Sequence, residues 1–248
     1  LDDYIYSLKL FDDVIHLSEL SPVRCKESKC IYVFTNMWLH IQNISPELIE
    51  QMLSQNRCMF LNVEMLSESK RMQHVLNLIK ENIQIMDYSI ANIHFLQLYA
   101  KEHNVEIKKP VIHLPYQFSL QDQIQLYNKG NNYDYDVGII NALPKQSDTV
   151  SSHLTYRRTK LWNDLQNTNL KSINIIGWGK ARDFLIKKCK VIINVHHFEC
   201  YKIFEHIRCD RILMAKKIII SDESIFMEKL DIYPFVYWSK FDKILETT

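Results

Sequence analysis

Residues 173–224 read INIIGWGKARDFLIKKCKVIINVHHFECYKIFEHIRCDRILMAKKIIISDES, and this stretch decides the fold. Three short apolar runs lie in it or at its border, at 172–176, 190–195 and 217–221, and polar or glycine residues follow each one. The segment 204–215, between the last two runs, has the length and composition of a helix. Short apolar runs bounded by turn residues are typical of buried strands, and their alternation with helices predicts parallel βαβ units.

The same alternation extends outward from this stretch. Further strands are predicted at 30–35, 59–63, 83–87, 110–114 and 136–140. Further helices are predicted from Ser45-Pro46-Glu47 onward, at 71–81, 90–103 and 155–165, and as a short tail at 240–245. We therefore expect an α/β protein with mostly parallel sheets in two Rossmann-like domains. The turn Lys129-Gly130-Asn131-Asn132 and the polar residues around it predict a division into residues 1–127 and 128–248.

The composition is that of an ordinary soluble globular protein. The 248 residues are 47% hydrophobic and 24% charged, which excludes intrinsic disorder. The formal charge of +1 gives no overall basic field, so we expect no nucleic-acid partner. No apolar run reaches the ~18 residues that a membrane span needs. The chain starts at Leu1 with neither a signal peptide nor a methionine, which is typical of a fragment or a trimmed chain.

Cysteine usage indicates the compartment. The six cysteines are scattered, and the closest pair, Cys25 and Cys30, has no second pair to complete a zinc pattern. We interpret them as reduced thiols, most of them small core residues, and expect a cytoplasmic protein, or one of the host cytoplasm if the chain is viral.

Candidate ligand-binding residues follow from the strand ends. In open α/β sheets, ligands bind beyond the carboxyl ends of the strands. In the second half these ends carry four groups of residues: Asn141, the turn Gly177-Trp178-Gly179-Lys180, the run His196-His197-Phe198-Glu199, and Ser221-Asp222-Glu223. The glycines let a backbone approach a phosphate closely, although the same turn is equally typical of a simple strand exit.

The two histidines have several interpretations. Neighbouring residues at a strand end point in opposite directions, so His196 and His197 do not form a natural zinc pair. One of them could donate a hydrogen bond into a cleft, and either could be a structural histidine. The motif Asp134-Tyr135-Asp136 matches the DxD of metal-dependent glycosyltransferases, but it precedes its strand, so we expect no metal site there.

Charged residues on two predicted helices are further candidates. Arg157, Arg158 and Lys160 could clamp phosphates or form a solvated helix face. Glu205 near a helix start could hold ribose hydroxyls, and Arg208 and Arg211 could hold a diphosphate. The same spacing is also typical of an intrahelical salt-bridged surface.

In the first half, Glu64 and Asp87 both lie at predicted strand ends. Either could deprotonate an acceptor hydroxyl, and either could instead cap a turn. Tyr88, Tyr116 and Phe118 could form a wall on which a sugar stacks, or could belong to the core.

The run at 173–224 resembles the donor-binding half of GT-B-type glycosyltransferases and is similar to small enzymes of this type in giant DNA viruses and some bacteria. The resemblance is good over about residues 136–222. It is weaker in the first half, where it rests on the segments "FLNVEMLSE" and "PVIHLPYQF". The resemblance implies two Rossmann-like domains that face each other across a cleft. The sequence departs from the family pattern at two places. Lys216 stands before the last strand where the family has a glycine, and the spacing from Glu199 to Glu205 is shorter than in the best-known members.

The resemblance implies a metal-independent transfer of a hexose or deoxyhexose from a UDP- or GDP-linked sugar to a glycan or carbohydrate hydroxyl. No cofactor or metal is expected. Donor contacts are expected from Asn141, Arg158, Lys160, Gly177, Trp178, Gly179, His196, His197, Phe204, Glu205 and Arg208, and catalytic roles from Asp87, Glu64 and Glu199. Two alternatives stay open: a non-catalytic nucleotide-sugar-binding module of a larger protein, and a GT-B-like sugar-nucleotide epimerase.

Overall fold

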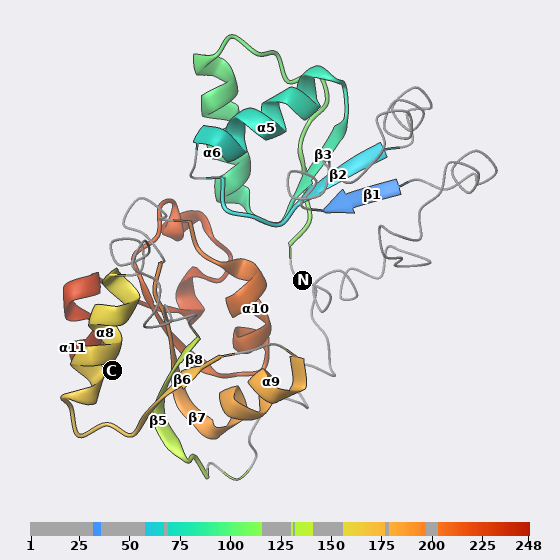
Figure 1. Ribbon diagram of the computed structural model, residues 1–248. Coiled ribbons are helices and arrows are strands. Elements are labelled where there is room, and N and C mark those ends of the chain that lie inside the picture. Colours follow the sequence, from blue (N-terminus) through green and yellow to red (C-terminus); the bar gives the residue numbers. More distant parts are fainter. Residues whose placement is uncertain are drawn as a thin grey trace, which may run out of the picture. The chain divides into compact units, whose positions relative to one another are not determined.

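The computed structural model describes residues 32–35, 58–66, 69–115, 130, 132–140, 156–176, 179–196 and 203–248 (Figure 1). The chain divides into two compact units, Leu1–Gln117 and Phe118–Thr248. Each unit contains one sheet whose described strand pairs are all parallel. The predicted α/β class and the predicted parallel sheets are therefore confirmed.

The first unit contains a sheet in the order β1-β2-β3-β4. Its strands are β1 (Tyr32–Thr35), β2 (Cys58–Asn62), β3 (Gln84–Asp87) and β4 (Ile112–His113). Two helices connect the last three strands, α5 (Ser69–Lys80) and α6 (Ile90–Glu102). Buried side chains of both helices, among them Leu76 and Leu96, form one core with Phe60 and Ile85 of the sheet.

The second unit contains a sheet in the order β6-β5-β7-β8-β9. Its strands are β5 (Tyr135–Ile140), β6 (Ser172–Ile175), β7 (Cys189–Asn194), β8 (Ile218–Asp222) and β9 (Tyr237–Ser239). Numbered from β5, this is the order 2-1-3-4-5, which is a common doubly wound arrangement. In such a sheet, the chain leaves in opposite directions from the two neighbouring strands at the switch point, here β5 and β7.

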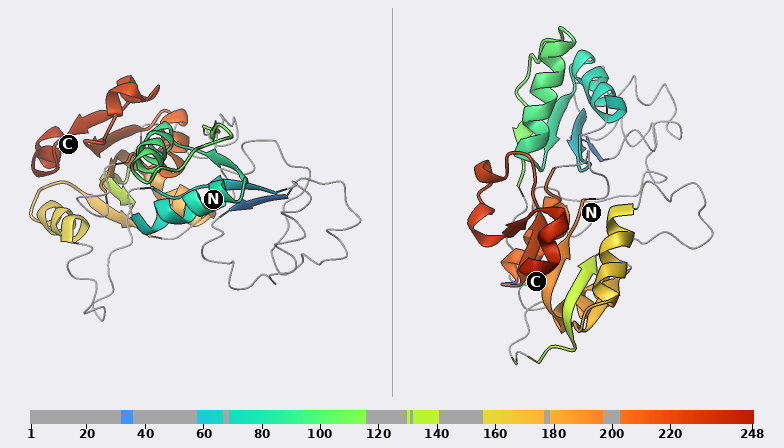
Figure 2. Two further views of the ribbon diagram at one scale, coloured as in Figure 1. Left: turned by 90° about the horizontal axis from the view of Figure 1, so that it is seen from above. Right: turned by 90° about the vertical axis from the view of Figure 1, so that its left-hand side faces the viewer.

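Helices cover both faces of this second sheet (Figures 1 and 2). The helices are α8 (Tyr156–Gln166), α9 (Gly179–Lys188), α10 (His206–Met214) and α11 (Ile244–Thr247). Leu161 of α8 and Ile244 of α11 belong to one core cluster, and Ile186 of α9 and Ile212 of α10 belong to another. Burial on both faces explains why the predicted strands read as nearly continuous apolar runs.

Three helices end in the same backbone motif. Asn82, Asn104 and Lys216 have positive φ angles of 61°, 53° and 60° directly after the C-caps of α5, α6 and α10. After α10, the N–H of Lys216 donates to the carbonyl of Leu213 and the N–H of Lys217 donates to that of Ile212. These paired bonds form a Schellman motif, which satisfies carbonyls that the helix leaves open. Lys216, at the position where the resembling family has a glycine, therefore adopts the left-handed backbone conformation that glycine favours.

Gly138 has a packing role in the central strand β5. A Cβ atom there would lie 2.6 Å from the Sγ of Cys189 and 2.8 Å from the Cδ1 of Ile175. Cys189 and Cys209 are buried free thiols in the core of this unit, as expected from the cysteine pattern. Across the described ranges, no helix combines the length and the apolar character that crossing a membrane would require.

Most predicted elements occur, with shifts of one or two residues at their ends. The helix predicted at 204–215 spans only His206–Met214, because Phe204 is a core residue that precedes it. The strand predicted at 110–114 is reduced to Ile112–His113. Strand β9 was not predicted, since its three residues are too few to show a period. The helix predicted from Ser45 onward lies outside the described residues.

Candidate functional site

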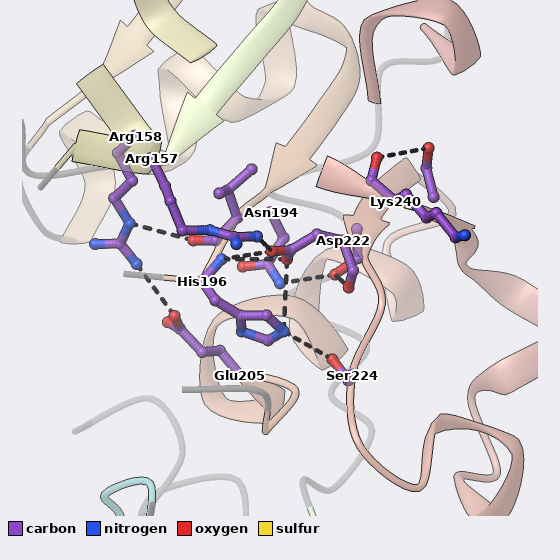
Figure 3. Close-up of polar contacts among 11 residues, drawn as sticks. Arg157, Arg158, Asn194, His196, Glu205, Asp222, Ser224 and Lys240 are labelled. Atoms are coloured by element: carbon purple, nitrogen blue, oxygen red, sulfur yellow. Dashed lines mark hydrogen bonds and ion pairs between the residues drawn. The ribbon is translucent and has the colours of Figure 1, made fainter. Parts of the chain in front are cut away.

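Charged side chains gather at the switch point of the second sheet. Helix α8 follows β5, α10 follows β7, and both begin on the side where those strands end. We define the switch-point cluster as Arg157, Arg158, His196, Glu205, Arg208 and Asp222. Figure 3 shows five of these side chains, which come from the start of α8, the ends of β7 and β8 and the residue before α10. This is where ligands bind in open α/β sheets.

Glu205 is held between two arginines. Its Oε1 lies 3.2 Å from Nη2 of Arg158, and its Oε2 lies 2.5 Å from Nη2 of Arg208. Arg158 also donates through Nε to the carbonyl of Val195 at 3.2 Å. Burial lowers the pKa of Arg158 to about 10, and Glu205 opposes that shift. The carboxylate therefore compensates a buried cation and joins the starts of α8 and α10 across the sheet edge.

Asp222 is the second carboxylate of the switch-point cluster. It accepts from Nη2 of Arg157 at 2.5 Å and from the backbone N–H of His196 at 3.2 Å. Only 2% of the residue is exposed. Burial raises its pKa, while His196 and Arg157 lower it. One buried carboxylate thus orients the end of β7 and the first turn of α8.

His196 lies within reach of Asp222 and Ser224. Its Nε2 is 3.0 Å from Oγ of Ser224 and 3.5 Å from Oδ1 of Asp222 (Figure 3). Only 1% of the residue is exposed. Burial lowers the pKa of the imidazole, and the nearby Asp222 raises it by a smaller amount. The ring is therefore neutral near pH 7. Its other nitrogen, Nδ1, is buried and has no hydrogen-bond partner among the described residues.

The switch-point cluster carries an excess of positive charge. Three guanidinium groups face two carboxylates, and the imidazole is neutral. The Nε of Arg157 is also buried without a hydrogen-bond partner within the described ranges, and its guanidinium lies 4.2 Å from the ring centroid of Phe241. The start of α10 adds the partial positive charge of a helix N-terminus. This arrangement can attract a phosphate or another anion.

Several residues predicted from the sequence belong to this cluster, and others do not. Arg158, His196, Glu205 and Arg208 are brought together as expected. Lys160 is 44% exposed on α8 and pairs with Asp164 one turn away at 2.5 Å, so it does not join them.

Three further candidates occupy other places in the second unit. Phe204 is a core residue that packs against Trp238 at 5.2 Å between ring centroids. Gly179 begins α9 with a φ of 62°. Arg211 is held by Asp183 of α9 through two bonds of 2.9 and 2.8 Å, and so has a structural partner in place of a phosphate. Asn141, Gly177, Trp178, His197, Glu199, Tyr116 and Phe118 lie outside the described residues.

The two carboxylates proposed as bases in the first unit differ in their surroundings. Asp87 is 1% exposed, and its oxygens accept from Nδ2 of Asn62 at 2.6 Å, from the N–H of Ser89 at 2.8 Å and from Nδ2 of Asn92 at 3.0 Å. Burial raises its pKa to about 7, and these three donors oppose the shift. Asp87 thus organises the strand ends of this sheet.

Glu64 is more accessible. Its side chain is 33% exposed and lies 3.2 Å from Nη1 of Arg71. Its backbone carbonyl accepts from Asn62 and Asn92, which also hold Asp87. Tyr88, considered for sugar stacking, is 3% exposed and belongs to the core, so the alternative interpretation holds for that residue.

Metal ligands are not grouped in the described parts of the chain, where no set of three histidine, cysteine or acidic side chains has a suitable arrangement. Asp134 pairs with Lys188, and Asp136 accepts from the backbone N–H of Lys171 at 2.9 Å. Both lie toward the amino end of β5 in the second sheet, as predicted from their position before this strand in the sequence.

Two residues of the site, Asn194 and Ser224, were not among the binding candidates predicted from the sequence. Asn194 donates to Oγ of Ser221 at 3.0 Å and accepts from Nη1 of Arg208 at 3.4 Å. Asn194 and Asp222 are the last residues of their strands, so the strand-end rule applies to both. Arg157 stands beside Arg158, and only the folded helix shows that both reach the same edge.

The chain resembles proteins of a giant virus. It is 30% identical over 219 residues to uncharacterized protein L140 of Acanthamoeba polyphaga mimivirus, which covers 86% of this chain and 64% of L140. It is 29% identical to protein L137 over 77% of this chain and 24% of L137, and 26% identical to protein L138 over 85% of this chain and 22% of L138. Both are described as uncharacterized proteins of the same virus. The chain thus spans less than two thirds of the length of each of these relatives.

No protein-family model matches the sequence. No solved structure matches the chain.

Proposed function

We propose that this protein is a glycosyltransferase that moves a hexose or deoxyhexose from a nucleoside diphosphate sugar to a carbohydrate or glycan hydroxyl. In this proposal the second unit binds the donor, the first unit binds the acceptor, and the two act together in a GT-B-like arrangement. The observation that carries the proposal is the switch-point cluster, an arginine-rich buried site at the ligand-binding edge of a doubly wound sheet.

The reaction needs the kind of charge that this cluster supplies. The bond between the anomeric carbon and the diphosphate oxygen breaks, and a bond from that carbon to the acceptor oxygen forms. Negative charge grows on the leaving diphosphate, and the acceptor proton passes to a base or to the departing phosphate. Arg157, Arg208 and the N-terminus of α10 are suited to stabilise that charge. This proposal assigns the chemistry to side chains and leaves the need for a metal to experiment.

The acceptor side rests on the first unit. An inverting reaction needs a base there, and Glu64 is a better candidate than Asp87. Glu64 is 33% exposed, whereas Asp87 is 1% exposed and has three N–H donors on its oxygens. A retaining reaction would need neither carboxylate as a base.

A thermal-shift panel tests the proposal. UDP, GDP, dTDP and CMP are added separately, with and without manganese, and we expect UDP or GDP to raise the melting temperature without the metal. Arg208→Gln should weaken the binding of that nucleotide by about tenfold, since it removes a charge-assisted hydrogen bond. Lys190→Gln is the matched control, because this exposed cation lies at the opposite end of β7. If none of the four nucleotides stabilises the chain, the proposal is wrong.

A second function has one observation in its favour. The relatives L137 and L138 are about four times as long as the region that matches this chain, so the fold occurs within larger polypeptides. A non-catalytic nucleotide-sugar-binding module would bind the same nucleotides without turnover. Incubation with the preferred nucleotide sugar distinguishes the two, because an enzyme releases free nucleotide at least slowly. Chromatography of the sugar would also show an epimerised donor.

Because the relatives are viral, we propose the cytoplasm of the infected host as the place of action.

A further inference from the structure

Nδ1 of His196 is buried and has no hydrogen-bond partner in the part of the chain that the structure describes. Whether it donates or accepts a hydrogen bond depends on the neighbours of the other ring nitrogen. A neutral imidazole has one N–H donor and one lone-pair acceptor, and which nitrogen is which depends on the surroundings. Nε2 faces the Oγ of Ser224 at 3.0 Å and Oδ1 of Asp222 at 3.5 Å. A carboxylate only accepts hydrogen bonds when ionised, and a hydroxyl can accept one. Both neighbours are therefore best satisfied when Nε2 carries the proton.

Other charged groups do not reverse this preference. Glu205 also acts on the imidazole, but less than Asp222 does, and both of its oxygens are engaged by arginines. Arg157 and Arg158 disfavour a second proton on the ring. With Nε2 protonated, Nδ1 is a lone-pair acceptor. Figure 3 shows this nitrogen on the side of the ring where Glu205 lies.

A buried acceptor without a partner costs about 1–3 kcal/mol, so its presence in the site points to a partner that arrives with the ligand. Phosphate oxygens at neutral pH cannot donate to it. The arginines of the switch-point cluster supply the cationic donors that phosphates need. The arginines therefore suit the phosphates of a ligand, and Nδ1 of His196 suits a part of the same ligand that donates a hydrogen bond.

We propose that Nδ1 of His196 accepts a hydrogen bond from a hydroxyl or N–H group of the bound nucleoside diphosphate sugar and thereby recognises its nucleoside or sugar part. This inference rests on the proposed function. It differs from the expectation drawn from the sequence, in which a histidine donates into the cleft. His196 is then a specificity residue, and the phosphates are left to the arginines.

Two substitutions separate the two ring nitrogens. His196→Gln places its amide near the position of Nε2, keeps the contact with Ser224 and removes the acceptor at Nδ1. His196→Asn places an amide near the position of Nδ1. Calorimetry compares inorganic pyrophosphate, UDP or GDP, and the matching hexose nucleotide. We expect His196→Gln to bind the nucleotide or nucleotide sugar about 5–10-fold more weakly, with unchanged pyrophosphate binding, and His196→Asn to recover most of the loss.

The pattern of losses identifies the group that donates. A loss already present with UDP or GDP assigns it to the nucleoside, and a loss that appears only with the nucleotide sugar assigns it to the sugar. An equal loss with pyrophosphate, or no loss with any probe, overturns the inference.

Nitrogen-15 NMR of the imidazoles gives a reading that needs no ligand. The His196 signals, identified by their absence in His196→Gln, should show the proton on Nε2 at pH 7.5. A proton on Nδ1 overturns the inference. If His196→Gln binds both the nucleotide and the nucleotide sugar as tightly as the wild type, the inference alone is contradicted. A wild-type chain that binds no nucleotide contradicts the proposed function, and the spectrum still decides the character of Nδ1.

Discussion

Arg158 and Glu205, 47 positions apart in the sequence, form an ion pair of 3.2 Å at the carboxyl edge of the second sheet. Their side chains are only 6% and 12% exposed. The pair connects the start of α8, on one face of the sheet, with the start of α10, on the other. Both residues were predicted to contact a donor, and the structure shows that each is also a partner of the other.

We expect Glu205→Ala to destabilise the protein by about 3 kcal/mol, because it leaves the buried guanidinium of Arg158 without its counter-charge. The double variant Arg158→Met with Glu205→Ala should be clearly less destabilised than the sum of the single variants Arg158→Met and Glu205→Ala. Urea unfolding of the four proteins measures this coupling.

The exposed pair Lys160–Asp164 on the same helix is the matched control. Its side chains are 44% and 40% exposed, and the same cycle there should give a coupling below about 0.5 kcal/mol. Equal couplings for the two pairs would contradict a special role for Arg158 and Glu205.

His196 should make stability depend on pH. Burial lowers its pKa below 6.5, so the folded chain takes up a proton less readily than the unfolded chain. Its contribution to stability is present above pH 6.5 and is lost as the pH falls from there toward the lowered folded pKa. Between pH 7.5 and pH 5.5 we expect the wild type to lose about 1 kcal/mol more unfolding free energy than His196→Gln. Parallel losses in both proteins would show that burial does not suppress protonation of this histidine.

Asp87 should titrate far above an ordinary carboxyl group. Burial raises its pKa from 3.8 to about 7, so the folded chain binds this proton more tightly than the unfolded chain. The corresponding stability is present below about pH 4 and is lost as the pH rises through about 7. Carbon-13 NMR of the carboxyl group should give a midpoint near 7, with Asp87→Asn to identify the signal. A midpoint below 5 would mean that its three N–H donors outweigh burial.

Lys216→Gly should stabilise the protein by about 0.5–1 kcal/mol. Lys216 has a φ of 60° in the Schellman motif that ends α10, and glycine adopts this conformation without the steric cost of a Cβ. Thermal unfolding compares it with Lys216→Ala, which also removes the charge but keeps the Cβ. If alanine stabilises as much as glycine, the gain comes from the loss of the lysine side chain and not from the backbone.

The elements of the fold were largely predictable because they depend on local patterns. The run Lys190–Val195 shows a buried strand by composition alone, and β7 spans Cys189–Asn194. The short strand β9 depends on pairing with β8, in the register Ser221 with Trp238, and has no local signal of its own. The strand order, which creates the switch point, is likewise a product of packing.

The site was predictable in position but not in its internal contacts. The strand-end rule pointed to His196 and the basic helix start pointed to Arg158, and the structure places both in the switch-point cluster. The sequence pattern did not distinguish Arg158 from Lys160. On a helix, a side chain two positions further along points in a different direction. The pattern also did not assign Arg211, which binds Asp183 of α9. Which charged side chains pair is decided by elements that are distant in the sequence.

The sequence by itself determined the α/β class and most of the strands and helices, because apolar periodicity and turn residues act over a few neighbouring positions. Only the tertiary structure decided the strand order, the pairing of Arg158 with Glu205, and the burial of Nδ1 of His196, which has no partner in the described part of the chain. These features depend on distances and on exclusion of water, which arise only when the elements pack together.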